Sequence, residues 1–324
     1  MKYWKIFLLL ATSFTIHTST NAQKTSSAAY HWLNFQWMGA TVSGRAFPKA
    51  AIFLPIQVSG LKGNFTAQFD LGSDVSELYG NSIINYYPSH TELFRHLDTL
   101  NKGSSDGSVT MYPVKTLSLS AGGYTIPDVF LADKFGDEVP KDSLFTASAK
   151  NIGTIGASFV KNKVLVIDFP NHRMCLLDSV DRYWLARTTF VTGRLRKGRM
   201  QLPFTINGKV IWILFDTGAS IYPLLVDKAL WTVITDPNAP IDSIKSNSWG
   251  EQVTFYGAPM KMDLYLGAYR LPKANAWYDE NKRLQEFNRQ EDISGITGNA
   301  YFLHNIIVID FKTNRFGVVR KDQH

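Results

Sequence analysis

The sequence predicts an all-β protein built from two similar lobes related by a pseudo-twofold axis. Apolar and polar residues alternate over short segments such as 116–131 and 260–271, and Gly, Pro and Asn separate these segments. This period of two, interrupted by turn residues, is typical of half-buried strands. Helical patterns are confined to residues 90–100, 225–231 and 279–290. A doubling of motifs along the chain, described below, gives the two lobes.

Residues 1–22 have the layout of a secretory signal peptide. Two lysines precede an apolar run over residues 6–16, and Thr20-Asn21-Ala22 offers a small-x-small cleavage site. An uncleaved membrane anchor is the alternative, but the run is short for a span of about 20 residues. We expect cleavage near Ala22-Gln23 and export to the periplasm or out of the cell. Residues 23–47 would then form either a first strand or a short pro-segment.

The composition argues against metal, cofactor and nucleic-acid chemistry. The chain has 324 residues, a formal charge of +7 and a single cysteine, Cys175, which cannot form an internal disulfide. The seven histidines show no metal-like clustering. The one dense basic run, residues 194–199, lies between the two repeats, where a solvated linker is favoured over a nucleic-acid patch. We therefore expect no cofactor, no metal and no nucleic-acid partner.

Three pairs of segments repeat in the same order along the chain. They are 54–74 with 202–220, 109–133 with 253–279, and 152–177 with 294–319. The first pair runs from Leu-Pro to Phe-Asp-x-Gly, the second opens on Val-Thr-x-Tyr, and the third carries Gly-x-x-Gly and Val-Ile-Asp-Phe. Chance similarity does not preserve both order and spacing, so an internal duplication is indicated. It predicts an N-terminal lobe over 48–178, a connector over 179–198 and a C-terminal lobe over 199–324.

Asp70 and Asp216 occupy equivalent positions in the first repeated pair. Each follows a mainly apolar strand and precedes x-Gly, which permits a tight turn that presents the carboxylate at the strand tip. If the lobes pack about a twofold axis, the tips meet, and the two carboxyls share one proton because both cannot ionise cheaply. The ionised carboxylate can then deprotonate a water molecule, while its protonated partner hydrogen-bonds the carbonyl under attack.

These motifs resemble those of the two-lobed aspartic proteases of the pepsin–retropepsin group. Phe-Asp-Thr-Gly-Ala-Ser at 215–220 is close to the family's active-site motif, and Phe-Asp-Leu-Gly-Ser at 69–73 is a variant of its first-lobe motif. The resemblance covers about residues 50–320. It implies two β-barrel-like lobes and a secreted, monomeric endopeptidase that acts on peptide or protein substrates. It further implies catalytic roles for Asp70 and Asp216 and support of the active-site turns by Gly72, Ser73, Thr217, Gly218 and Ser220.

One departure from the family pattern concerns the first-lobe motif. Leu71 stands where the family has Thr or Ser. By resemblance, that hydroxyl bonds across to the other lobe's turn. We call the two reciprocal hydroxyl bonds between the turns the grip. Thr217 can still make its bond to the first-lobe turn, whereas Leu71 cannot make the reciprocal bond.

A second departure concerns the hairpin that resembles the pepsin flap. Ser104 stands where pepsins carry a Tyr, shortly before the Gly107-Ser108 step. Tyr112 and Tyr256 are candidates to replace it as substrate-binding aromatics. Each is equally interpreted as an ordinary strand aromatic.

Two other functional interpretations stay open. Leu71 and the altered flap favour a catalytically impaired, peptide-binding protein of the same fold, in which Asp70 is a structural relic. A single-lobe enzyme that works by dimerising is disfavoured because both halves keep their Asp.

Ser73 and Ser220 are expected to hydrogen-bond the turns rather than act as nucleophiles, since no His lies in a comparable motif.

Asp168 and Asp310 also repeat as a pair, at the ends of the Val-Ile-Asp-Phe segments. Each is followed five residues later by an arginine, Arg173 or Arg315. We expect these aspartates to form ion pairs at strand ends and to have no part in catalysis.

Overall fold

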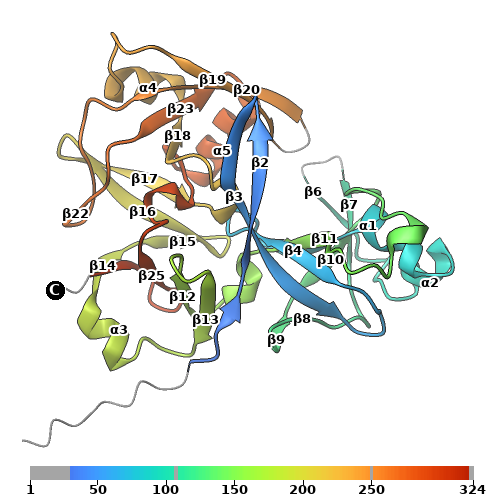
Figure 1. Ribbon diagram of the computed structural model, residues 1–324. Helices are drawn as coiled ribbons and strands as arrows, with labels where there is room; N and C mark the ends of the chain where they lie inside the picture. Colours follow the sequence, from blue (N-terminus) through green and yellow to red (C-terminus); the bar gives the residue numbers. More distant parts are fainter. Residues whose placement is uncertain (1–29, 106–108, 249–250, 321–324) are drawn as a thin grey trace, which may run out of the picture. The chain divides into compact units, whose positions relative to one another are not determined.

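A computed structural model describes residues 30–105, 109–248 and 251–320, which form a mostly β structure (Figure 1). The predicted signal peptide and the Gly107-Ser108 step lie outside these residues. Along the described ranges, no helix is both long enough and apolar enough to cross a membrane. The described part of the N-terminal segment, residues 30–47, contains β1 (Leu33–Asn34), β2 (Gln36–Val42) and the start of β3 (Arg45–Val58).

The first half of the chain forms a ten-stranded sheet. Its strands lie in the order β6-β7-β10-β5-β11-β4-β3-β8-β9, and β2 pairs with β3 beside this path. The remaining bounds are β3 (Arg45–Val58), β4 (Phe65–Phe69), β5 (Ser76–Tyr79), β6 (Gly103–Ser105), β7 (Val109–Pro113), β8 (Leu119–Ala121), β9 (Tyr124–Ile126), β10 (Val129–Ala132) and β11 (Lys150–Ile155).

The second half forms another ten-stranded sheet with the same plan. Its order is β19-β20-β23-β18-β24-β17-β16-β21-β22, with β15 paired to β16. The bounds are β15 (Arg194–Arg196), β16 (Arg199–Ile206), β17 (Lys209–Phe215), β18 (Leu224–Val226), β19 (Asp242–Ser248), β20 (Glu251–Pro259), β21 (Leu264–Leu266), β22 (Tyr269–Arg270), β23 (Asn275–Asp279) and β24 (Gly295–Thr297). Every strand of one sheet has a counterpart at the same place in the other, as the sequence duplication predicts.

The expectation of barrel-like lobes was wrong in one respect. Among the described residues each large sheet has two free ends and does not close on itself. Short strands such as β6 and β22 end the two sheets. The repeats alternate apolar residues well enough to predict strands, but alternation carries no information on closure.

A third sheet of six strands joins the two halves. Its order is β1-β13-β12-β25-β26-β14, and the antiparallel pair β12–β25 aligns Val166 with Val308. The bounds are β12 (Val164–Asp168), β13 (Arg173–Leu177), β14 (Thr188–Thr192), β25 (Ile306–Asp310) and β26 (Arg315–Val319). The Val-Ile-Asp segments of both repeats form the buried centre of this sheet, which explains their nearly continuous apolar character.

Helices are short and lie in the connections. They are α1 (Gly80–Ile83), α2 (His90–Phe94), α3 (Arg182–Arg187), α4 (Lys228–Ile234), α5 (Lys282–Glu291), and the 3₁₀ turns η1 (Ile84–Tyr86), η2 (Lys141–Ser143), η3 (Ala157–Val160), η4 (Thr217–Ala219) and η5 (Asn299–Tyr301). The three predicted helical segments contain α2, part of α4 and most of α5. The predicted connector, residues 179–198, contains α3, β14 and β15.

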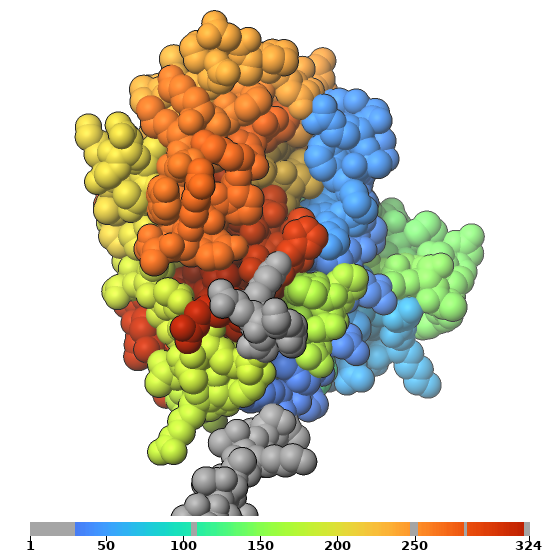
Figure 2. All heavy atoms as spheres, turned by 60° about the vertical axis from the view of Figure 1, so that its left-hand side comes forward, coloured from blue at the N-terminus to red at the C-terminus, as the bar shows by residue number. Residues whose placement is uncertain are grey.

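The β2–β3 ribbon reaches from the first large sheet to the second. Its tip bonds to β19, where Arg45 pairs with both carboxylate oxygens of Asp242 at 2.6 and 3.0 Å. The Ser43 hydroxyl accepts the backbone N–H of Lys245 at 2.8 Å. Figure 2 shows the ribbon, in blue, against the orange surface of the second sheet. The two large sheets are therefore linked at the ribbon tip as well as through the six-stranded sheet.

Candidate active site

The two predicted catalytic aspartates lie at equivalent strand tips. Asp70 follows β4 and its backbone N–H donates to the carbonyl of Ile155 at 3.0 Å, while Asp216 follows β17 and donates likewise to Thr297 at 2.9 Å. The residue before each aspartate, Phe69 or Phe215, is fully buried and anchors the strand. Both aspartates are partly buried. The repeat thus places the two carboxyls in matching backbone frames.

Each aspartate is bound by the glycine of its own turn. The Gly72 N–H donates to Asp70 Oδ1 at 2.8 Å, and the Gly218 N–H donates to Asp216 Oδ1 at 2.7 Å. These bonds fix the orientation of both carboxyl groups.

The same two glycines bring the turns together. A Cβ atom on Gly72 would lie 2.5 Å from Asp216 Oδ2, and one on Gly218 would lie 2.5 Å from Asp70 Oδ2. Any side chain at either position would therefore displace the aspartate of the other sheet. The structure brings Asp70 and Asp216 together across two glycines, and this close approach is the physical reason for the Asp-x-Gly pattern.

The carboxyls interact directly, and this sets the protonation of Asp216. Burial raises the pKa of Asp216 well above its usual value, and the negative charge of Asp70 and a hydrogen bond between the two side chains raise it further. The N–H groups of Gly218 and Ala219 oppose this rise without cancelling it. One proton is consequently held between the two groups, as expected for like charges at hydrogen-bond distance.

Thr217 joins the two turns, as predicted for its half of the grip. Its hydroxyl accepts the Leu71 N–H at 2.9 Å and donates to the Phe69 carbonyl at 2.8 Å. Thr217 is fully buried, and Leu71 is buried among apolar residues. The link is one-sided because Leu71 has no hydroxyl to return it.

The two predicted supporting serines hydrogen-bond within their own turns. The Ser73 hydroxyl donates to the Val75 carbonyl, and the Ser220 hydroxyl donates to the Thr217 carbonyl, each at 2.8 Å. Asn299 strengthens the second turn, because its side-chain amide donates to the Thr217 carbonyl at 3.1 Å and to the Ser220 hydroxyl at 2.6 Å. Asn299 was not predicted. It directly follows the Gly-x-x-Gly segment of the second repeat, which marked its neighbourhood but not its role.

Arg199 is a second residue that sequence reasoning missed. It lies in the basic run 194–199, which was interpreted as a solvated linker. The structure corrects this interpretation, since Arg199 is buried, donates to the Gly72 carbonyl at 3.1 Å and pairs with Glu291 at 2.8 Å. Burial of one arginine in a charge run has no local signal in sequence, because its partners lie far along the chain.

The two candidate substrate-binding tyrosines pack against aromatic rings, Phe94 of α2 and Tyr278 of β23. Tyr112 on β7 meets Phe94 edge-on at a centroid distance of 5.2 Å, and Tyr256 on β20 stacks on Tyr278 at 5.2 Å. Both are partly buried against the core. Their role in binding substrate stays a prediction.

The strand-end ion pairs predicted for the other repeated aspartates are confirmed. Arg173 Nε lies 2.9 Å from Asp168 Oδ2, and Arg315 Nη2 lies 2.9 Å from Asp310 Oδ2. Both carboxylates are buried and take further hydrogen bonds from the following turn. Within the described ranges, no group of three or more His, Cys, Asp or Glu is placed to hold a metal ion.

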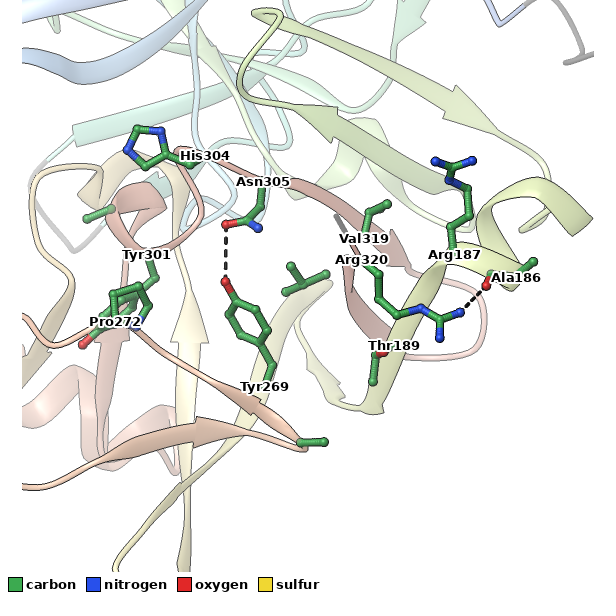
Figure 3. Close-up of a pocket in the computed structure, with 13 residues that line it drawn as sticks. Ala186, Arg187, Thr189, Tyr269, Pro272, Tyr301, His304, Asn305, Val319 and Arg320 are labelled. Atoms are coloured by element: carbon green, nitrogen blue, oxygen red, sulfur yellow. Dashed lines mark hydrogen bonds between the residues drawn. The ribbon is translucent and has the colours of Figure 1, made fainter. Parts of the chain in front are cut away.

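A pocket of about 1070 Å³ lies apart from the aspartates, between β22, η5 and the edge of the six-stranded sheet (Figure 3). The Tyr269 hydroxyl donates to Asn305 Oδ1 at 3.4 Å, and Arg320 donates to the Ala186 carbonyl. The basic side chains that line this pocket are those of Arg187, His304 and Arg320. They point in different directions in Figure 3 and do not converge on one point. The pocket contains no residue of either Asp turn.

Comparison with known proteins adds no family assignment. Models of protein families give no match to this chain, and neither do the curated proteins searched with it.

Proposed function

We propose that this protein is an aspartic-type peptidase with the two-lobed fold of the pepsin–retropepsin group. The observation that carries the proposal is the pairing of Asp70 and Asp216, each bound by the glycine of its own turn and pressed against the glycine of the other. Two carboxyls that share a proton suit general acid–base hydrolysis without a metal or a nucleophilic side chain. The matching strand orders of the two large sheets support the fold assignment.

In the proposed reaction, a water molecule binds between the two carboxyls. The ionised carboxylate takes a proton from the water as its oxygen attacks the peptide carbonyl carbon, and the protonated carboxyl hydrogen-bonds the carbonyl oxygen. The tetrahedral intermediate then collapses, the C–N bond breaks, and a carboxyl delivers a proton to the leaving amine. The raised pKa of Asp216 supports a pair that holds one proton at the start of the cycle. Export after removal of residues 1–22 belongs to the same proposal.

A second candidate function is peptide binding without cleavage. The presence of Leu71 favours this candidate. Only Thr217 bonds across, so the first turn has fewer hydrogen bonds to the second turn than the family pattern provides. The lost hydrogen bond is worth about 1 kcal/mol, which loosens the pair without removing either carboxyl.

Cleavage of a peptide library between pH 3 and pH 8, followed by mass spectrometry, separates the two candidates. We expect new peptide termini with the wild-type protein and none above background with Asp216→Asn. The matched control is Asp128→Asn, an exposed turn residue whose left-handed backbone Asn tolerates. Absence of Asp216-dependent cleavage at every pH would refute the peptidase proposal, and retained peptide binding would favour the second candidate.

A further inference from the structure

We propose that Arg199 and Glu291 are positioning residues that hold the Asp70 turn in place from the opposite sheet. This inference rests on the proposed function, because it assigns the pair a role in aligning the two aspartates. Arg199 opens β16 of the second large sheet, and its Nη1 donates to the Gly72 carbonyl at 3.1 Å. Gly72 belongs to the turn of the first sheet, so the arginine crosses from one sheet to the other.

Glu291 fixes the arginine at its other end. Arg199 Nη2 lies 2.8 Å from Glu291 Oε1, and the two side chains are 8% and 3% exposed. Two more exposed cations also face this carboxylate, Lys197 at 3.1 Å and Arg196 at 3.7 Å. A buried guanidinium paired with a buried carboxylate cannot leave its place without stranding an unpaired charge, so the donor that faces Gly72 is rigidly held.

The backbone of the helix end that carries Glu291 is held too. The Gln201 side-chain amide donates to the Glu291 carbonyl at 3.0 Å, and Gln201 is fully buried on β16. The side-chain amide oxygen Oε1 of Gln201 in turn accepts a hydrogen bond from Arg194 Nε at 2.5 Å. Arg199 and Glu291 therefore sit in a framework of the second sheet that does not depend on the first.

The hydrogen bond from Arg199 holds Gly72, the residue that also binds the Asp70 carboxyl. The Gly72 N–H donates to Asp70 Oδ1, while its carbonyl accepts from Arg199. Thr217 holds the preceding residue through the Leu71 N–H. Besides the hydrogen bond between Asp70 and Asp216, the first turn is thus held from the second sheet by the Thr217 hydroxyl and by Arg199. The hydrogen bond from Arg199 replaces the cross-sheet bond that a hydroxyl at position 71 would make. A charged donor such as Arg199 makes a stronger hydrogen bond than a neutral hydroxyl.

Hydrogen exchange measured by mass spectrometry tests this role without requiring activity. The variant is Arg199→Met with Glu291→Gln, which removes both charges together and avoids a stranded one. We expect the amides of residues 67–76 to exchange about ten- to a hundredfold faster than in the wild type. The control, Arg315→Met with Asp310→Asn, removes an arginine pair with a buried carboxylate from the six-stranded sheet and should leave this segment unchanged. Equal exchange in wild type and variant would overturn the inference.

Two activity readouts separate positioning from general stability. With a cleaved peptide as substrate, the Arg199→Met, Glu291→Gln variant should lose about tenfold or more in kcat with KM within about twofold of wild type. Adding Leu71→Thr should recover part of that loss, because the new hydroxyl offers the turn another cross-sheet bond. A loss confined to KM, or no recovery, would contradict the inference. If the wild type cleaves nothing while exchange in residues 67–76 still rises, the peptidase proposal fails and the positioning of the turn stands.

Discussion

The Thr217 hydroxyl accepts the backbone N–H of Leu71 at 2.9 Å, across the boundary between the two large sheets. It also donates to the Phe69 carbonyl at 2.8 Å, so one side chain holds the first turn on both sides of Asp70. The reverse contact is missing because position 71 is apolar. The alignment of the two aspartates consequently depends on Thr217 and on the link from Arg199.

Replacing Thr217 with Val keeps the shape of the side chain and removes both hydrogen bonds. The Leu71 N–H and the Phe69 carbonyl would then be buried without these partners, at a cost of about 1–3 kcal/mol each. We expect a loss of at least about 2 kcal/mol in the free energy of unfolding, measured with denaturant, and a fall of tenfold or more in kcat/KM. Thr205→Val, on β16 and outside the turns, is the control. Unchanged stability in Thr217→Val would contradict the grip.

Replacing Leu71 with Thr should raise activity. By the symmetry of the two turns, the new hydroxyl would accept the Thr217 N–H and donate to the Phe215 carbonyl. We expect kcat to rise severalfold, while loss of the buried Leu side chain costs about 1–3 kcal/mol of stability. Leu71→Val, which has the shape of Thr without its hydroxyl, is the control. If Val and Thr have the same effect on kcat, the missing hydroxyl is not what limits activity.

The stability of the protein should depend on pH through Asp216. Its folded-state pKa lies above the unfolded value, so its contribution to stability is fully present below about pH 3.8 and is lost as the pH rises through the folded-state pKa. Asn mimics the protonated form at every pH. We therefore expect Asp216→Asn to gain stability relative to wild type between pH 4 and pH 7, measured by denaturant unfolding at each pH. A constant difference across this range would contradict the raised pKa.

Asp279, at the end of β23, gives a comparison away from the site. Burial raises its pKa to about 6, which outweighs the hydrogen bond from the Asn281 N–H. Its contribution to stability is likewise present at low pH and is lost as the pH rises from about 3.8 through about 6. Asp279→Asn should be more stable than wild type by about 3 kcal/mol at neutral pH, with activity kept. An equal difference at pH 3.5 and pH 7 would show that Asp279 does not titrate in this range.

The sequence alone predicts the β class, the duplication and the neighbourhood of Asp70 and Asp216. These follow from patterns that are local and occur twice, such as Phe-Asp-x-Gly and the alternating hairpins. The ion pairs of Asp168 and Asp310 were also predictable, because each arginine follows five residues later on the adjacent strand. Either Phe-Asp-x-Gly motif alone is a weak signal. Because the motif occurs twice in equivalent positions, the two together predict that Asp70 and Asp216 form a pair.

The parts that sequence could not predict depend on distant residues. Arg199 belongs to a basic run, and only its partners Gly72 and Glu291 distinguish it from its exposed neighbours. Arg45 and Asp242 are likewise 197 positions apart. Whether a sheet closes into a barrel depends on the pairing of its edge strands, which alternation does not encode.

The most direct test of the central claim is a double-mutant cycle on kcat/KM with Asp70→Asn and Asp216→Asn, assayed on one cleaved peptide. Because the two carboxyls act as a unit, we expect each single variant to lose at least about a thousandfold, and the double variant to be within a few-fold of either. An Asp70→Asn variant within about tenfold of wild type would contradict the claim, since it would leave Asp216 working without a partner.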